Sequence, residues 1–296
     1  MNEYIVTNKT LIKSNNKSSY IFDRYFYSLI AFVILQVITY LIFDNSDSVL
    51  PLLKSLLISF IFTSIVAYLI NIIFKDYNFI NIYKKDNVHI IAIIIGLFAI
   101  NVNILVLAIA ILVSLIIKKI NQNINISSSL YGIIIIMIYH YFTDSLYIIN
   151  DLLNIELNKK IITNYLIGTN FLNPILSLAM FVYLFIKKSI KYNIFIYYIS
   201  TIFIITLIIG IVNNMHITLP FIVLASNNII FLSIYILTDY MNTPTTPEVQ
   251  IIYGIILGIV TTILTFVIPS FSVVIPMLLG PLLLTKLLDN NSYKIK

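Results

Sequence analysis

The residues that could do chemistry gather in one short stretch near the carboxyl end of the chain. It runs from Thr238 to Gly254 and reads TDYMNTPTTPEVQIIYG, with two prolines three residues apart and two carboxylates. Thr246 is placed to cap a helix that has Pro247 at its first position and Glu248 in its first turn. The stretch is therefore either a well-formed helix start or a rigid loop whose hydroxyl and backbone N–H groups face a ligand or a partner subunit.

The remaining polar residues inside apolar segments are uncharged. Asn227 and Asn228 interrupt one segment and could line a cavity, and Asn71 and Ser114 lie within two others. Amide and hydroxyl side chains in such segments often only bond one helix to the next. No Asp, Glu, Arg or Lys is expected at the middle of a membrane-crossing segment, which disfavours a transporter that couples ions through a buried carboxylate.

The residue types and their spacing also argue against metal and thiol chemistry. The chain has no cysteine, so it forms no disulfide and supplies no thiolate to an iron–sulfur cluster. His89, His140 and His216 lie far apart and lack the spacing of metal ligands. No metal ligand and no catalytic residue is predicted.

The elements that must position these residues are membrane helices. Of the 296 residues 60% are hydrophobic and 10% are charged, whereas a soluble domain has about 25% charged residues. A helix needs about 20 residues to cross the hydrocarbon, and the chain is divided into ten apolar runs, two of them short and separated only by residues 101–103. The runs are Tyr25–Phe43, Leu52–Phe74, Val88–Ile100, Ile104–Ile117, Ile126–Phe142, Asn173–Ile186, Ile194–Val212, Leu219–Leu237, Ile251–Ile268 and Phe271–Leu288.

The distribution of basic residues tests this count. If the amino terminus is cytoplasmic and each run reverses the side, only Lys54, Lys159 and Lys160 of the 18 basic residues fall outside. This asymmetry follows the positive-inside rule. The net charge of +6 therefore indicates topology and not a nucleic-acid partner, and both termini are predicted to be cytoplasmic.

The chain divides at a long polar stretch, Thr143–Thr163. Five crossings on each side of it make two halves of opposite orientation, as in an inverted repeat. We predict an all-α, polytopic membrane protein of about ten transmembrane helices in two inverted five-helix halves. The segments are a cytoplasmic amino-terminal segment (1–24), the first half (25–142), an outer loop (143–172), the second half (173–288) and a cytoplasmic tail (289–296).

Three stretches together resemble the RnfD/NqrB family, the flavin-carrying membrane subunits of ion-translocating electron transport complexes. The strongest is Thr238–Gly254, and Asn123–Gly132 and Leu166–Thr169 are similar to further family stretches in the same order. The resemblance implies ten helices in two inverted halves and a bacterial plasma membrane. It also implies electron transfer through flavin or quinone partners, a cytoplasmic electron donor and an outer flavoprotein.

The resemblance also suggests where a cofactor would bind. The candidate residues are Thr238, Asp239, Thr243, Thr246, Asn123, Asn125, Asn227 and Asn228. Family members attach FMN covalently to a threonine of a Ser-Gly-Ala-Thr motif in the outer loop after the fifth helix, and residues 143–163 contain no such motif. No covalent FMN site is therefore identified. Two alternatives are open: a flavin (FMN or riboflavin) that binds without a covalent bond, or loss of the cofactor altogether.

Two other classes of function remain open from the sequence. The scarcity of buried charge suits a non-redox channel or transporter for a small solute. A structural membrane subunit that holds other subunits together is the third class.

Overall fold

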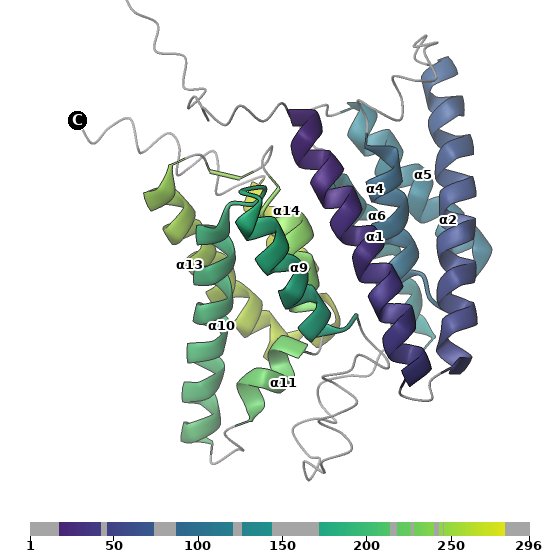
Figure 1. Cartoon of the computed structure of the whole chain (residues 1–296). Helices are drawn as coiled ribbons and strands as arrows, with labels where there is room; N and C mark the ends of the chain where they lie inside the picture. The colour runs from purple at the N-terminus through teal and green to yellow at the C-terminus, as the bar shows by residue number, and fades with distance from the viewer. Residues whose placement is uncertain are drawn as a thin grey trace, which may run out of the picture.

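The computed structural model describes residues 18–42, 46–73, 87–120, 126–143, 172–213, 218–225, 228–239, 243–244 and 246–281. These residues form a bundle of helices and contain no strand (Figure 1). The predicted all-α class is confirmed. Residues 1–17 of the predicted amino-terminal segment, the predicted tail and most of the outer loop lie outside the described residues, whereas residues 18–24 are helical and continue the first run. The division into segments stays a prediction.

The first part of the bundle follows the predicted runs closely. Its helices are α1 (Ser18–Ile42), α2 (Ser46–Ile73), α4 (Val88–Phe98), α5 (Ile104–Ile120), the short η1 (Ile126–Ser128) and α6 (Ser129–Phe142). The two short runs form a helical hairpin. Asn101 makes the turn between α4 and α5 in the left-handed conformation, with φ of 61°, which asparagine adopts more readily than most residues.

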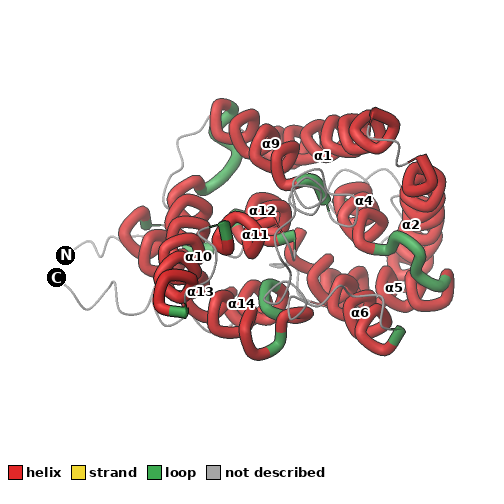
Figure 2. Tube along the Cα trace, turned by 90° about the horizontal axis from the view of Figure 1, so that it is seen from below, coloured by secondary structure: helices red, strands yellow, loops and turns green. Residues whose placement is uncertain are grey.

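The second part contains shorter and more irregular helices. They are α9 (Pro174–Ile186), α10 (Tyr192–Val212), α11 (Leu219–Ala225), α12 (Ile229–Leu232), η2 (Ser233–Leu237), α13 (Pro247–Val267), η3 (Pro269–Phe271) and α14 (Val274–Leu279). The run predicted at Leu219–Leu237 is broken where the amides interrupt it, and its two segments lie at 59° to each other. Seen along the bundle, α1 and α9 line one side while α13, α14 and α6 lie on the opposite side (Figure 2).

Four helical segments are long and apolar enough to cross a membrane, and a fifth span results if the bent pair is counted as one. The long segments are Ile21–Ile42, Ser48–Ile73, Tyr192–Val212 and Pro247–Val267. Several other apolar helices have 17 residues or fewer. The structure thus confirms membrane-type helices, while the count of ten is not reached by length alone.

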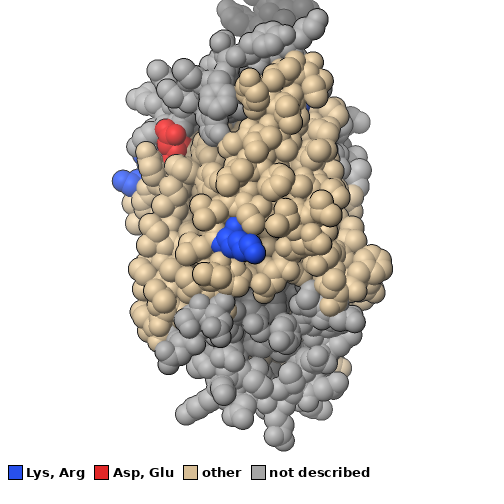
Figure 3. Space-filling view, turned by 90° about the vertical axis from the view of Figure 1, so that its right-hand side faces the viewer, with Lys and Arg blue, Asp and Glu red and all other residues tan. Residues whose placement is uncertain are grey.

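The outer surface of the bundle is apolar. On α2, Leu57, Ile61 and Ile65 are all more than half exposed and lie four residues apart, so they form one stripe along the helix. The side of the molecule in Figure 3 is covered mainly by uncharged residues, with few charged side chains. Such a surface is suited to lipid, because an apolar area of this kind is unfavourable in contact with water.

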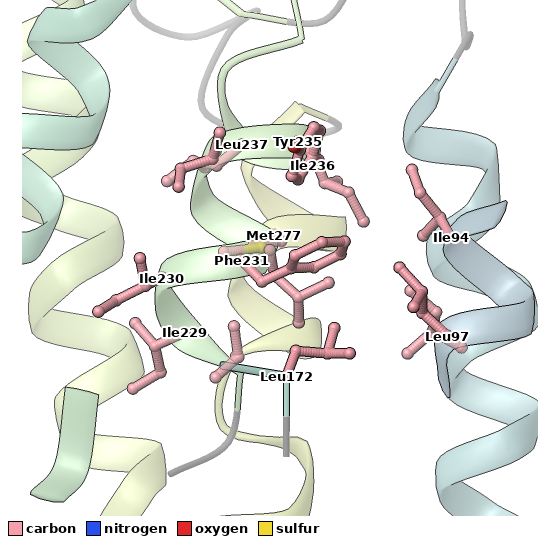
Figure 4. Packing of buried hydrophobic residues seen from close by; sticks show 14 of the residues in the cluster. Ile94, Leu97, Leu172, Ile229, Ile230, Phe231, Tyr235, Ile236, Leu237 and Met277 are labelled. Atoms are coloured by element: carbon pink, nitrogen blue, oxygen red, sulfur yellow. The ribbon is translucent and has the colours of Figure 1, made fainter. Parts of the chain in front are cut away.

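The centre of the bundle is where the third runs of the two parts meet. Phe231 of α12 packs against Phe98 of α4 and Phe32 of α1, with ring centroids 6.2 and 5.1 Å apart. Ile94 and Leu97 of α4 face the same helix (Figure 4). This contact places the broken segment α12–η2 in the core and fixes the position of the loop that follows it.

Candidate functional site

The loop after η2 lies at the end of the bundle where α1 begins and where α9 connects to α10, the upper end in Figure 1. Tyr25 of α1 bonds Thr238 through the two hydroxyl oxygens, which are 3.2 Å apart. The Thr238 hydroxyl also donates to the Ile234 carbonyl oxygen, and the side chain is fully buried. Thr238 is therefore held by its own helix and by α1.

Asp239 connects the loop to the first part of the bundle. The residue is 1% exposed, and its Oδ2 accepts a hydrogen bond from the backbone N–H of Ser127 at 3.4 Å. Ser127 belongs to η1 and lies in the stretch that resembles the family after the fourth helix. The two family-like stretches are thus neighbours in space, although 112 residues separate these two positions.

Thr243 is held by a buried lysine. Lys191 Nζ donates to the Thr243 carbonyl oxygen at 2.9 Å and to Oγ1 at 2.7 Å, and the Thr243 hydroxyl donates to the Asp239 carbonyl oxygen at 2.7 Å. Lys191 is only 7% exposed. Because a buried ammonium needs its donors satisfied, these bonds tie the loop firmly to the start of α10.

The loop ends at the amino terminus of α13. Thr246 is the residue before the helix, Pro247 is at its first position and Glu248 is in its first turn, as predicted. The expected capping bond is absent, however: the Thr246 side chain caps no backbone N–H. The Thr246 hydroxyl oxygen is buried and has no hydrogen-bond partner among the described residues. Instead, Gln250 closes the turn by donating to the Pro244 carbonyl oxygen at 3.1 Å.

Asn228 lies away from this loop. The nine residues of α12 and η2 separate it from Thr238, a rise of about 14 Å at 1.5 Å per residue. Its backbone is left-handed, with φ of 55°, and its side-chain Oδ1 accepts from the Leu172 N–H at 2.9 Å. Asn228 therefore holds the helix break against the start of α9.

Of the other predicted residues, Asn123, Asn125 and Asn227 lie outside the described residues. The two polar residues within helices have structural partners. Asn71 Oδ1 accepts from Lys119 Nζ at 2.9 Å, and the Ser114 hydroxyl donates to the carbonyl oxygen of Ala110 one turn earlier. The structure brings together Thr238, Asp239, Thr243 and Thr246 as one site.

Comparison with known families is decisive for the class of protein. The family described as NQR2, RnfD, RnfE matches residues 5–274, nearly the whole chain. The chain belongs to the NQR2, RnfD, RnfE family. No curated protein matches the chain. Membership confirms the resemblance and supports a membrane subunit of an Rnf/Nqr-type complex.

Two residues of this family member's site were not predicted from the sequence. From the sequence, Lys191 is only one of the basic residues on the cytoplasmic side, and Tyr25 is only the first residue of an apolar run. A lysine just before a predicted helix gives no sign of burial, because its partner, Thr243, is 52 residues away. The signal for Lys191 therefore exists only in the folded chain.

The site is a bonded network of a buried carboxylate, a buried ammonium and the hydroxyl groups of Thr238 and Thr243. Groups of three or more His, Cys, Asp or Glu residues that could hold a metal are absent from the part of the chain that the structure describes. Three of the four candidate side chains use their polar atoms within the protein. Thr246 alone among the four offers a hydroxyl without a partner.

Proposed function

We propose that this chain passes electrons across the bacterial plasma membrane between flavin or quinone partners, as a membrane subunit of an Rnf/Nqr-type complex that couples this transfer to ion transport. The observation on which this rests is the family match over residues 5–274. Both termini face the cytoplasm in this proposal, in line with the distribution of basic residues.

The proposed architecture is ten crossings in two inverted halves. The neighbours of equivalent helices support it: α2 packs on α4 and α5, α10 packs on α11 and α13, and α1 meets α9 between the halves. The helix breaks support it as well. Asn87 and Asn228, with φ of 47° and 55°, are left-handed residues directly before α4 and α12, the helices of the third crossing in each half.

The partner subunits would lie at opposite faces. We assign the cytoplasmic electron donor to the Asp239–Gln250 loop, because Thr238, Asp239 and Thr243 are bonded to Tyr25, Ser127 and Lys191. Residues that are already held lose little conformational entropy when a partner binds. The outer flavoprotein would bind near Thr143–Thr163, most of which lies outside the described residues.

A non-covalent flavin is the proposed cofactor, and the loop limits how it could bind. Thr246 offers the unpartnered hydroxyl. The start of α13 is a poor phosphate site, since Pro247 removes one backbone N–H and Glu248 adds a negative charge in the first turn. The residues therefore fit the ring or ribityl group of riboflavin better than the phosphate of FMN. A bound flavin would supply the electron-carrying chemistry, and Thr246 would donate to it.

The experiment is purification of the full chain, alone and with its complex, followed by visible absorbance and identification of any released flavin. We expect yellow protein that releases riboflavin under denaturation without proteolysis. Thr246→Val should lower flavin content, whereas Thr201→Val should not, because the Thr201 hydroxyl already donates to the Tyr197 carbonyl oxygen. Colourless, fully helical protein in both preparations would remove the flavin from the proposal.

Reconstitution separates the remaining classes of function. Electron transfer across liposomes that requires the partner subunits supports the proposed role. Flux of a small solute through liposomes with this chain alone would instead establish the channel. Co-purification of the complex without cofactor, electron transfer or flux would leave a structural subunit.

A further inference from the structure

Three basic residues converge at the turn between α9 and α10. Arg24 of α1 donates through Nη1 to the Lys187 carbonyl oxygen and lies 3.5 Å from the Ser189 hydroxyl. Lys187 and Lys188 are exposed, and neither has an ion-pair partner among the residues that the structure describes. Lys191, three residues further on, is buried and holds Thr243, so it belongs to the loop site and not to this surface.

The backbone at Lys188 is unusual for a lysine. The Lys188 N–H donates to the Phe185 carbonyl oxygen and the Ser189 N–H to that of Leu184, both at 2.9 Å. This pattern is the Schellman motif, whose left-handed residue is usually glycine. Lys188 occupies that position with φ of 53°. A side chain there is strained, and strain that a folded chain retains suggests that the side chain has a function.

Exposed aromatic and apolar side chains flank the two lysines in the chain and form what we call the wall. Phe185 is 45% exposed, Ile186 67% and Tyr192 46%. The rings of Phe185 and Tyr192 are in edge contact with centroids 5.2 Å apart. Tyrosine at such a position is typical of the membrane–water interface. The cationic side chains match the phosphate of a phospholipid, and the lipid-facing wall matches its acyl chains.

We propose that Arg24, Lys187 and Lys188 bind the phosphate group of an anionic phospholipid of the inner leaflet, with its acyl chains on the wall of Phe185, Ile186 and Tyr192. Asp23 and Glu248 are the exposed acids on the adjoining helix starts, and they weaken the positive field without reversing it. A free phosphate would use the cations alone and leave the wall uncovered, so the geometry favours the lipid.

The test uses the purified full chain in a neutral detergent. Phosphatidylglycerol should raise the midpoint of thermal unfolding, whereas phosphatidylcholine and inorganic phosphate should not. Native mass spectrometry should show about fivefold weaker phosphatidylglycerol binding for each lysine removed, in Lys187→Gln and in Lys188→Gly, because one cation near an anionic surface contributes about 1 kcal/mol. Lys54→Gln, an exposed lysine on α2, is the matched control and should bind as the parent does.

Lys188→Gly separates lipid binding from a structural role. Glycine relieves the left-handed strain, so the lipid-free midpoint should rise while the response to phosphatidylglycerol falls. A fall in both the lipid-free midpoint and the response to phosphatidylglycerol would give Lys188 only a structural role and overturn the proposal. Equal stabilisation by inorganic phosphate would leave an anion site without lipid. The double variant Lys187→Gln/Lys188→Gly could also lose its partner subunits while its response to phosphatidylglycerol stays unchanged. That result would assign the surface to an acidic protein partner instead.

Discussion

At the residue scale, the buried ammonium of Lys191 is the group on which the loop depends. It links the start of α10 to Thr243 through two hydrogen bonds, and Thr243 in turn bonds Asp239. A charged side chain in such a place is retained only when it is bonded. The loop is therefore held by a contact that crosses between two helices and not by its prolines alone.

Replacing Lys191 by methionine should lower the free energy of unfolding by about 1–3 kcal/mol, since the Thr243 carbonyl oxygen loses its partner in a buried site. Thermal or denaturant unfolding in detergent measures the change. Lys54→Met is the control, because an exposed lysine should alter stability by less than about 0.5 kcal/mol. Equal stabilities of the two variants would contradict the role given to Lys191.

At the helix break, the contributions of the Asn228 backbone conformation and of its side-chain hydrogen bond to stability can be measured separately. Asn228→Gly keeps the left-handed conformation but loses the bond to the Leu172 N–H, whereas Asn228→Ala loses the bond and adds strain. The Asn228→Ala variant should therefore be less stable than the Asn228→Gly variant by about 1–2 kcal/mol. Asn101, also left-handed but exposed, is the control. There, glycine should be at least as stable as the parent, because the Asn101 side chain has no buried bond to lose.

At the element scale, the packing of α13 on α10 depends on two glycines. A Cβ at Gly254 would lie 2.8 Å from the Ile194 carbonyl oxygen, and one at Gly258 would lie 2.8 Å from Thr201 Cβ and 3.0 Å from the Tyr198 carbonyl oxygen. Backbone atoms cannot move aside as a flexible side chain can. The two helices thus approach closely because small residues face the contact, as is common between membrane helices.

Gly254→Ala should separate α10 from α13 and reduce stability by about 1–3 kcal/mol, the usual effect of overpacking. Ile259→Ala, on the lipid side of α13 with 40% exposure, should change it much less. Because α13 begins at the loop, the glycine variant should also weaken binding of partner subunits. Unfolding midpoints and co-purification measure both effects, and a neutral Gly254→Ala would mean that the helices can separate without cost.

At the scale of the whole molecule, the topology can be tested cleanly because the chain has no cysteine. Single cysteines at Lys119 and Lys188 should be labelled from the cytoplasmic side, and one at Lys54 from the outer side. Labelling of positions 119 and 188 from opposite faces would refute the ten-crossing topology. The cytoplasmic assignment of the loop and of the lipid surface would then fail with it.

The sequence by itself determined the solvent and the general plan of this protein. The chain has too few charges to cover a water-facing surface, so it requires lipid, and its apolar runs separated by polar turns require helices. Both conclusions could be drawn from the sequence because both signals are local and additive along the chain. The Thr238–Gly254 stretch likewise identified the family. The short hairpin of α4 and α5 and the break before α12 were visible for the same reason, since asparagines interrupt apolar runs there.

Only the tertiary structure decided which polar groups meet. Asp239 meets Ser127 and Lys191 meets Thr243 across 112 and 52 residues, and no local pattern encodes such contacts. The structure also showed that Thr246 precedes α13 without capping it, and that Lys188 fills a position suited to glycine. Burial and pairing are properties of the packed helices, so residues of the same type, such as Lys188 and Lys191, acquire different roles only after folding.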